Sequence, residues 1–300
     1  MPSSSESVPL KSKSSAATSL GSRMRVEQAV EHLWPGQHVE VEALGGGITN
    51  HNFKVCVDGE ALVLRIGGKD TALLGIDREH EHEAALMAAR LGIGPEVVCF
   101  ADGVLVTRFV EGEVGRTDTA TVGTMLKRLH DAPRIAGRFD SFRVVEAYAA
   151  AASGRGRSLP DAFGRAHELA RRIEAHRAAA PRVTCHNDLL AANFIDDGER
   201  VWLVDWEYAG MGDPFFDLAN FAVNNGLDEE GETALLEAYG SADTRALTLM
   251  RFMSDFREAM WGVVQQAISE LDFDFVAYAD EHFERLWRTA SEARFKAALA

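Results

Sequence analysis

Three polar side chains near the middle of the chain have the types and the spacing that phosphoryl transfer requires. Asp188 is followed five residues later by Asn193, and Asp205 comes twelve residues after that amide. In this chemistry one carboxylate accepts or orients the proton of the attacking hydroxyl, while an amide oxygen and a second carboxylate hold Mg²⁺ on the nucleotide phosphates. Apolar stretches frame the set, which favours a catalytic loop over its alternative, a plain polar loop between two buried strands. We therefore expect Asp188 to act on the hydroxyl, and Asn193 and Asp205 to bind the metal.

The elements that must position these residues can be predicted from the hydrophobic pattern. Before residue 111 the pattern predicts five strands with one helix inserted among them, and Asp58-Gly59 is typical of a hairpin turn. After residue 112 the pattern is mostly helical, and the last third is rich in aromatic residues. We expect an α+β fold of two lobes, a small antiparallel sheet followed by a larger, mostly helical part. The predicted strands are 39–44, 53–57, 62–66, 97–100 and 104–109, and the predicted helices include 78–91, 121–130 and 161–178.

The same pattern divides the chain into three segments. Residues 1–22 are rich in serine and poor in large apolar side chains, which is typical of a disordered tail. Residues 23–111 are predicted to form an N-terminal nucleotide-binding lobe. Residues 112–300 are predicted to form a C-terminal lobe for catalysis and substrate binding.

Composition narrows the classes of partner. The chain has 31 Lys and Arg against 46 Asp and Glu, so its formal net charge is −15, which disfavours nucleic acid and anionic lipid surfaces. No apolar run approaches the ~20 residues that span a bilayer, so membrane insertion is not expected. The three cysteines, Cys56, Cys99 and Cys185, have no spacing typical of a metal site or a disulfide framework, which favours a cytoplasmic location.

Several segments together resemble one known family. The chain resembles the choline/ethanolamine kinase branch of the aminoglycoside-phosphotransferase-like kinases from about residue 44 to residue 288. The resemblance implies a two-lobed, protein-kinase-like fold, ATP and Mg²⁺ as cofactors, and an amino alcohol such as choline as the small-molecule substrate. The segments that carry it include GGGITN at 45–50, HNDLLAANF at 186–194, VDWEYA at 204–209 and DPFFDLANF at 213–221.

The nucleotide is expected to contact mainly the first lobe. Glycines before the second strand let the main chain approach a triphosphate, because they have no Cβ. Arg65 lies in the middle of an apolar strand and resembles the family's phosphate-binding cation; Glu81 is its expected partner, with Glu79 and Glu83 as alternatives. The adenine is expected to lie against the segment 109–112. The expected nucleotide-binding residues are Gly46, Gly47, Thr49, Asn50, Arg65, Glu81, Phe109 and Val110.

The substrate is expected to contact the last third of the chain and the metal loop. Aromatic faces hold quaternary ammonium groups through cation–π attraction, and Trp261 and Tyr278 resemble positions near that pocket in the family. The alternative is that these rings only fill a core. Glu207 can face a second Mg²⁺, the substrate amine or solvent. His186 is expected to brace its loop, and Asp217 to accept hydrogen bonds from it.

Two other functions compete with this prediction. One is a different phosphotransferase of the same fold, such as an aminoglycoside phosphotransferase. The other is a non-catalytic nucleotide-binding or scaffold protein. The intact set of Asp188, Asn193 and Asp205 counts against the second alternative.

Overall fold

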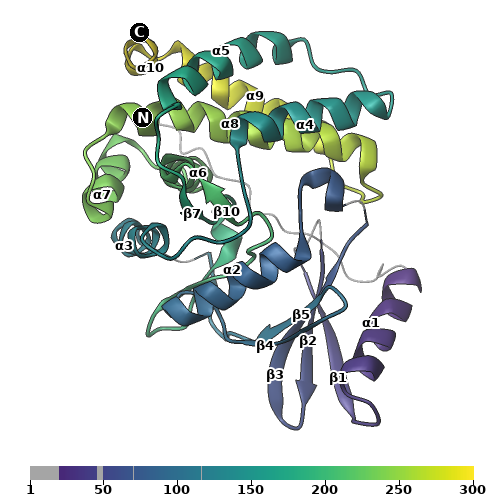
Figure 1. Cartoon of the computed structure of the whole chain (residues 1–300). Helices are drawn as coiled ribbons and strands as arrows, with labels where there is room; N and C mark the ends of the chain where they lie inside the picture. Colours follow the sequence, from purple (N-terminus) through teal and green to yellow (C-terminus); the bar gives the residue numbers. More distant parts are fainter. Residues whose placement is uncertain (1–19, 46–49, 70, 116) are drawn as a thin grey trace, which may run out of the picture. The chain divides into compact units, whose positions relative to one another are not determined.

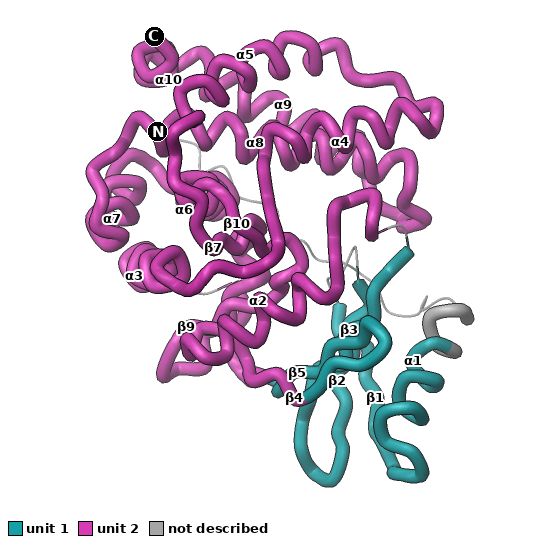
Figure 2. The backbone as a smooth tube through the Cα atoms, in the orientation of Figure 1, with its two compact units in different colours: residues 1–69, 99–109 teal, residues 70–98, 110–300 magenta. Residues whose placement is uncertain are grey.

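The computed structural model describes residues 20–45, 50–69, 71–115 and 117–300 (Figure 1). The tail predicted for residues 1–22 lies outside the described residues except for its last three, which begin the first helix. Gly46, Gly47 and Thr49 of the predicted phosphate loop also lie outside them. The chain divides into two compact units, the first formed by residues up to 69 together with 99–109, the second by 70–98 and 110–300 (Figure 2).

The first unit is an antiparallel sheet with one helix packed on it. The strand order in the sheet is β1-β2-β3-β5-β4. Positive φ angles at Asp58 and Gly59 form the tight turn between β2 and β3, as the sequence predicts. Alternate residues of the central strands, such as Val55 and Leu64, are fully buried and pack with Val26 of α1. The elements are α1 (Leu20–Leu33), β1 (Val39–Leu44), β2 (Asn50–Val57), β3 (Glu60–Gly67), β4 (Val97–Ala101) and β5 (Val104–Arg108).

The second unit is mostly helical and contains the short strands of the catalytic segment. Its helices are α2 (Arg78–Leu91), α3 (Thr119–His130), α4 (Ser141–Gly154), α5 (Ala162–Arg177), α6 (Pro214–Asn224), α7 (Glu229–Tyr239), α8 (Thr244–Ile268), α9 (Phe275–Ser291) and α10 (Ala293–Leu299), with 3-10 turns at η1 (Thr71–Leu74) and η2 (Ala191–Asn193). Its strands are β6 (Glu113–Val114), β7 (Val183–Cys185), β8 (Phe194–Asp196), β9 (Val201–Leu203) and β10 (Gly210–Gly212). The predicted α+β class, with an antiparallel five-stranded sheet followed by a helical region, is confirmed.

Aspartates set the starts of many of these helices. Asp77 caps α2 by accepting hydrogen bonds from the main-chain N–H groups of Glu79 and His80, and Gly92 ends the helix in the left-handed conformation. Side chains of Asp118, Asp140, Asp213, Asp228, Asp243 and Asp274 cap other helices in the same way. Such local signals explain why α2 has the bounds predicted from sequence.

The long helix α8 forms the centre of the second unit. It packs against α4, α6, α9 and α10, and Figure 1 shows it among them. Phe252, Met253 and Phe256 on this helix are fully buried. No described helix is long and apolar enough to cross a membrane. Asp255, Arg257 and Glu258 on α8 are also buried, and buried charges need partners.

Candidate active site

The catalytic loop follows β7 and is fixed by the side chain of His186. This imidazole is fully buried, and its Nδ1 lies 3.2 Å from the main-chain nitrogen of Asp188. Because that N–H donates, Nδ1 accepts and Nε2 carries the proton, which Nε2 donates to the carbonyl oxygen of Val204 at 3.1 Å. His186 is thus a neutral brace between the catalytic loop and the metal loop, the role predicted for it.

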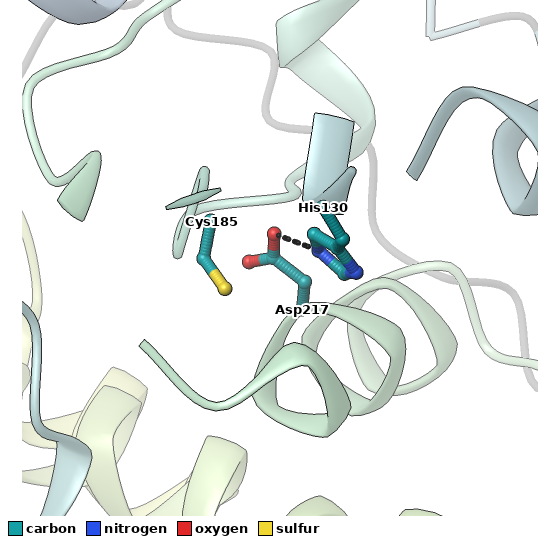
Figure 3. A group of neighbouring side chains, drawn as sticks. All are labelled: His130, Cys185 and Asp217. Carbon is teal, nitrogen blue, oxygen red and sulfur yellow. Dashed lines mark hydrogen bonds and ion pairs between the residues drawn. The ribbon is translucent and has the colours of Figure 1, made fainter. Parts of the chain in front are cut away.

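Asp217 on α6 holds the start of the same loop. Its two carboxylate oxygens accept the main-chain N–H groups of His186 at 2.8 Å and Asn187 at 2.7 Å, and one of them also bonds His130 at 3.0 Å. Figure 3 shows the contact between His130 and Asp217, with Cys185 beside them. Burial, together with the charges of Asp217 and Asp213, raises the pKa of the Cys185 thiol well above its ordinary value. Asp217 is therefore a structural acceptor, as predicted.

Two residues of this region have a backbone conformation that side chains other than glycine rarely adopt. Asn187 has φ 67° and Asp205 has φ 71°. Such positions cost about 1–3 kcal/mol and persist where the surroundings fix them. For Asn187 the fixing contact is visible, because its side-chain amide donates to the carbonyl oxygen of Tyr208 at 3.0 Å.

The predicted catalytic and metal-binding residues come together in the second unit. The amide nitrogen of Asn193 donates to the carbonyl oxygen of Asp188 at 2.8 Å, and the main-chain N–H of Val204, beside Asp205, donates to the carbonyl oxygen of Asn193 at 3.0 Å. The amide oxygen of Asn193 and the carboxylate of Asp205 are hard ligands that suit Mg²⁺. The donor set fits the metal.

Asp188 itself is buried beside an arginine. Burial raises the pKa of its carboxyl to about 7; Arg257 opposes the rise, whereas Glu258 and Asp205 add to it. Arg257 Nη1 lies 3.2 Å from Asp188 Oδ1, and the same guanidinium packs over the ring of Tyr208. A carboxylate with a pKa near neutrality suits a general base.

Arg257 and the role of Glu258 are the main features that sequence reasoning missed. The guanidinium is 1% exposed, and its Nη1 lies 2.6 Å from Glu258 Oε1. Glu258 also accepts the hydroxyl of Tyr278 at 2.9 Å. Although burial raises the pKa of Glu258, the charge of Arg257 leaves it below its ordinary value. The sequence feature that could have indicated this site is the charged pair Arg257 and Glu258 within the mostly apolar helix α8.

The predicted substrate residues lie in two places within the second unit. The ring of Trp261 on α8 packs edge-on against Phe275 at 5.8 Å and Tyr278 at 5.4 Å between centroids. Trp261 is 8% exposed, so its ring is both a core residue and part of an aromatic cluster next to Glu258. Glu207 is buried and lies 3.8 Å from Arg78 Nη1. Its side chain therefore does not simply face solvent.

The predicted nucleotide-binding residues belong to both units. In the first unit, Asn50 begins β2 and Arg65 lies on β3, and both are buried. Lys54 Nζ lies 4.2 Å from the ring centroid of Phe109, the last residue of this unit. In the second unit, Glu81 on α2 bonds Arg78 at 2.5 Å. The Arg65–Glu81 pair and an adenine contact at 109–110 remain predictions.

Similarity to known proteins identifies the family to which the chain belongs. Residues 40–256 match the sequence profile described as the phosphotransferase enzyme family, and the chain belongs to that family. The predicted resemblance to choline and ethanolamine kinases is likewise confirmed. A choline/ethanolamine kinase family protein from Mesorhizobium loti has a solved structure that superposes with a TM-score of 0.78 at 31% identity, covering 93% of this chain and 97% of that one.

Two further similarities show how far the relationship extends. Protein LicA of Haemophilus influenzae is 30% identical over 214 residues, a match covering 65% of this chain and 61% of LicA. The GDP complex of aminoglycoside 2'-phosphotransferase-IIIa has a TM-score of 0.60 at 16% identity, covering 89% of this chain and 97% of that one, which shows a shared fold.

Proposed function

We propose that this chain is an ATP- and Mg²⁺-dependent kinase that transfers the γ-phosphate of ATP to the hydroxyl of choline or a related amino alcohol. The observation that carries the proposal is the buried catalytic loop, in which the carboxylate of Asp188 is held by Arg257 and the amide of Asn193 is held by Asp188. This arrangement supplies an acceptor for a hydroxyl proton next to hard oxygen ligands. The family assignment and the Mesorhizobium loti structure support the same conclusion.

Each residue then has one task. Asp188 accepts a hydrogen bond from the substrate hydroxyl and aligns it with the phosphorus atom, which lowers the entropic cost of attack. Asn193 and Asp205 would hold Mg²⁺, whose charge offsets the negative charge of the nucleotide phosphates. Asn50, Arg65 and Phe109 are proposed contacts of ATP, together with the glycine loop before β2.

The amino group of the acceptor is assigned to the aromatic cluster. A cation over an aromatic face gains about 0.5–2 kcal/mol, and Trp261 and Tyr278 provide such faces beside the charge of Glu258. This favours a compact ammonium over a polycationic sugar, which requires a wide acidic surface. Glu207 stays a candidate second contact for the amine.

A coupled ADP-release screen tests the proposal. The full chain is incubated with Mg-ATP and, separately, with choline, ethanolamine, thiamine and kanamycin, and Asp188→Ala serves as the inactive control. We expect acceptor-dependent ADP release with choline or ethanolamine. Turnover with kanamycin alone would replace the amino alcohol by an aminoglycoside. Binding of Mg-ATP with no turnover on any alcohol would favour the non-catalytic alternative.

A further inference from the structure

Arg257 makes two contacts with consecutive residues of the catalytic loop. Nη1 lies 3.2 Å from Oδ1 of Asp188, and Nη2 donates to the carbonyl oxygen of Asn187 at 3.2 Å. The guanidinium is planar and its N–H directions are fixed, so these two contacts determine where the carboxylate lies relative to the main chain. Face-on packing against Tyr208, 4.6 Å from the ring centroid, restricts the plane of the guanidinium as well.

Glu258 balances the charge of this arginine. Its Oε1 lies 2.6 Å from Arg257 Nη1, and its Oε2 accepts the hydroxyl of Tyr278. Arg257 therefore has two carboxylate partners, Asp188 and Glu258. Because the guanidinium charge is shared between the two acids, Arg257 orients Asp188 without pairing with it alone.

The contacts return to the catalytic loop through a second helix. Asn220 on α6 donates to Glu258 Oε1 at 3.4 Å, and its side-chain oxygen accepts the main-chain N–H of Leu189 at 2.5 Å. A closed ring of hydrogen bonds therefore runs from Asp188 through Arg257, Glu258 and Asn220 to Leu189. Two helices thus determine the conformation of the residues on both sides of the catalytic carboxylate.

We propose that Arg257, balanced by Glu258, is a positioning residue for the transfer reaction, and that it holds Oδ1 of Asp188 so that Oδ2 is presented to the acceptor hydroxyl. The inference rests on the proposed function, because it assigns Asp188 to that hydroxyl. A positioning role and a purely structural role have different measurable consequences. A structural ion pair affects unfolding, whereas a positioning residue affects how often the transferred phosphoryl group reaches the alcohol instead of water.

The chain contains a matched control for this distinction. Arg251 lies on the same helix, six residues before Arg257, and forms an ion pair with Glu232 of α7. Glu232 also pairs with Arg294 at 2.7 Å. The Arg251–Glu232 pair is largely buried. Arg251 donates hydrogen bonds to Glu232 and to the carbonyl oxygen of Leu227, not to the catalytic loop.

The experiment compares two double variants of the full chain. Arg257→Met/Glu258→Gln removes both charges of the proposed pair together, so that Glu258 is not left buried without its partner, while Asp188 loses its contact with the guanidinium. Arg251→Met/Glu232→Gln removes both charges of the control pair, and Arg294 keeps Glu292 as a partner. For each protein the melting temperature, kcat, KM for ATP and the ratio of ATP hydrolysed to alcohol phosphorylated are measured with the acceptor found in the screen.

We expect the first double variant to lose about 10- to 100-fold in kcat because the hydroxyl is no longer aligned, with the KM for ATP changed less than about twofold because neither residue is a proposed contact of ATP. Its ratio of hydrolysis to transfer should rise at least about threefold. The control double variant should have a lower melting temperature, with kcat and the ratio of hydrolysis to transfer within about twofold of the wild type.

A single substitution covers the case in which the first double variant fails to fold. Arg257→Lys keeps the charge, but one ammonium cannot hold Asp188 and Asn187 in a fixed fork. We expect a folded protein with a reduced kcat and a raised hydrolysis ratio. The inference would be overturned if either Arg257 variant had the wild-type kcat and the wild-type ratio of hydrolysis to transfer. It would also be overturned if the two double variants lost kcat equally. A wild-type chain that phosphorylates no alcohol would instead overturn the proposed function.

Discussion

The amide nitrogen of Asn193 donates a 2.8 Å hydrogen bond to the main-chain carbonyl oxygen of Asp188. Because a carbonyl oxygen can only accept, this contact determines which end of the carboxamide faces the catalytic loop. The amide oxygen, which is the end that binds a hard cation, is therefore turned away from Asp188. One hydrogen bond thus sets the orientation of an expected metal ligand from the catalytic residue itself.

Replacing Asp188 with alanine should stop transfer and preserve the fold. Loss of the acceptor for the hydroxyl proton should lower kcat by about 10²–10⁴, while the KM for ATP changes little. The fold should persist because Arg257 keeps Glu258 as its partner at 2.6 Å. Steady-state kinetics and a thermal melt measure both effects. A folded variant that retains more than about a tenth of the wild-type kcat would show that another group acts on the hydroxyl.

Asp205→Asn should raise the Mg²⁺ requirement and lower kcat. The substitution keeps the shape of the side chain but removes a charged oxygen ligand, which weakens binding of a hard cation. Activity is titrated against Mg²⁺ at saturating ATP and acceptor, with Asp205→Glu as the variant that keeps the charge. An unchanged Mg²⁺ midpoint in Asp205→Asn would place the metal elsewhere, with Glu207 the next residue to test.

Local sequence signals predicted the elements well. Helix α2 begins and ends where the sequence predicts, at 78 and 91, because Asp77 caps its start and Gly92 ends it. The hairpin at Asp58-Gly59 was predicted for the same reason, since the residues that form a turn are neighbours in sequence. The last third was predicted only as helical, although Asp228, Asp243 and Asp274 cap α7, α8 and α9 there.

The ordered motif also predicted the roles of His186 and Asp217, but the ring around Asp188 could not be predicted. Arg257 lies 69 residues from Asp188, and no local pattern indicates which loop a helix interior will face. The partners of Asp255 on the same helix could not be predicted either. In the structure it pairs with His282 at 2.9 Å and Arg285 at 3.1 Å, so its charge is balanced within the core.

Asp217→Asn should destabilise the protein without changing its Mg²⁺ requirement. A carboxamide has one acceptor oxygen, so one of the buried N–H groups of His186 and Asn187 would face an NH₂ group instead. Leaving that donor unsatisfied should cost about 1–3 kcal/mol. Thermal or urea unfolding measures the loss, and Asp280→Asn on the exposed side of α9 is the control. A shifted Mg²⁺ midpoint in a variant of normal stability would instead make Asp217 a metal ligand.

Trp261→Ala should weaken binding of the amino-alcohol acceptor and leave ATP almost unaffected. Loss of one aromatic face should cost about 0.5–2 kcal/mol, or about 2- to 30-fold in the KM for choline. The ring also packs against Phe275 and Tyr278, so its removal should destabilise the fold by about 3–5 kcal/mol.

The control for this substitution separates packing from recognition. Phe252 is fully buried on the same helix and contacts Trp287 and Phe295 instead of the cluster around Trp261. Phe252→Ala should therefore lower the melting temperature by a similar amount and leave the KM for choline within about twofold of the wild type. Melting curves and both KM values are measured for the two variants side by side. If Trp261→Ala lowers the melting temperature as Phe252→Ala does and leaves the KM for choline unchanged, the ring is only part of the core, and the acceptor's ammonium group must be held by other residues.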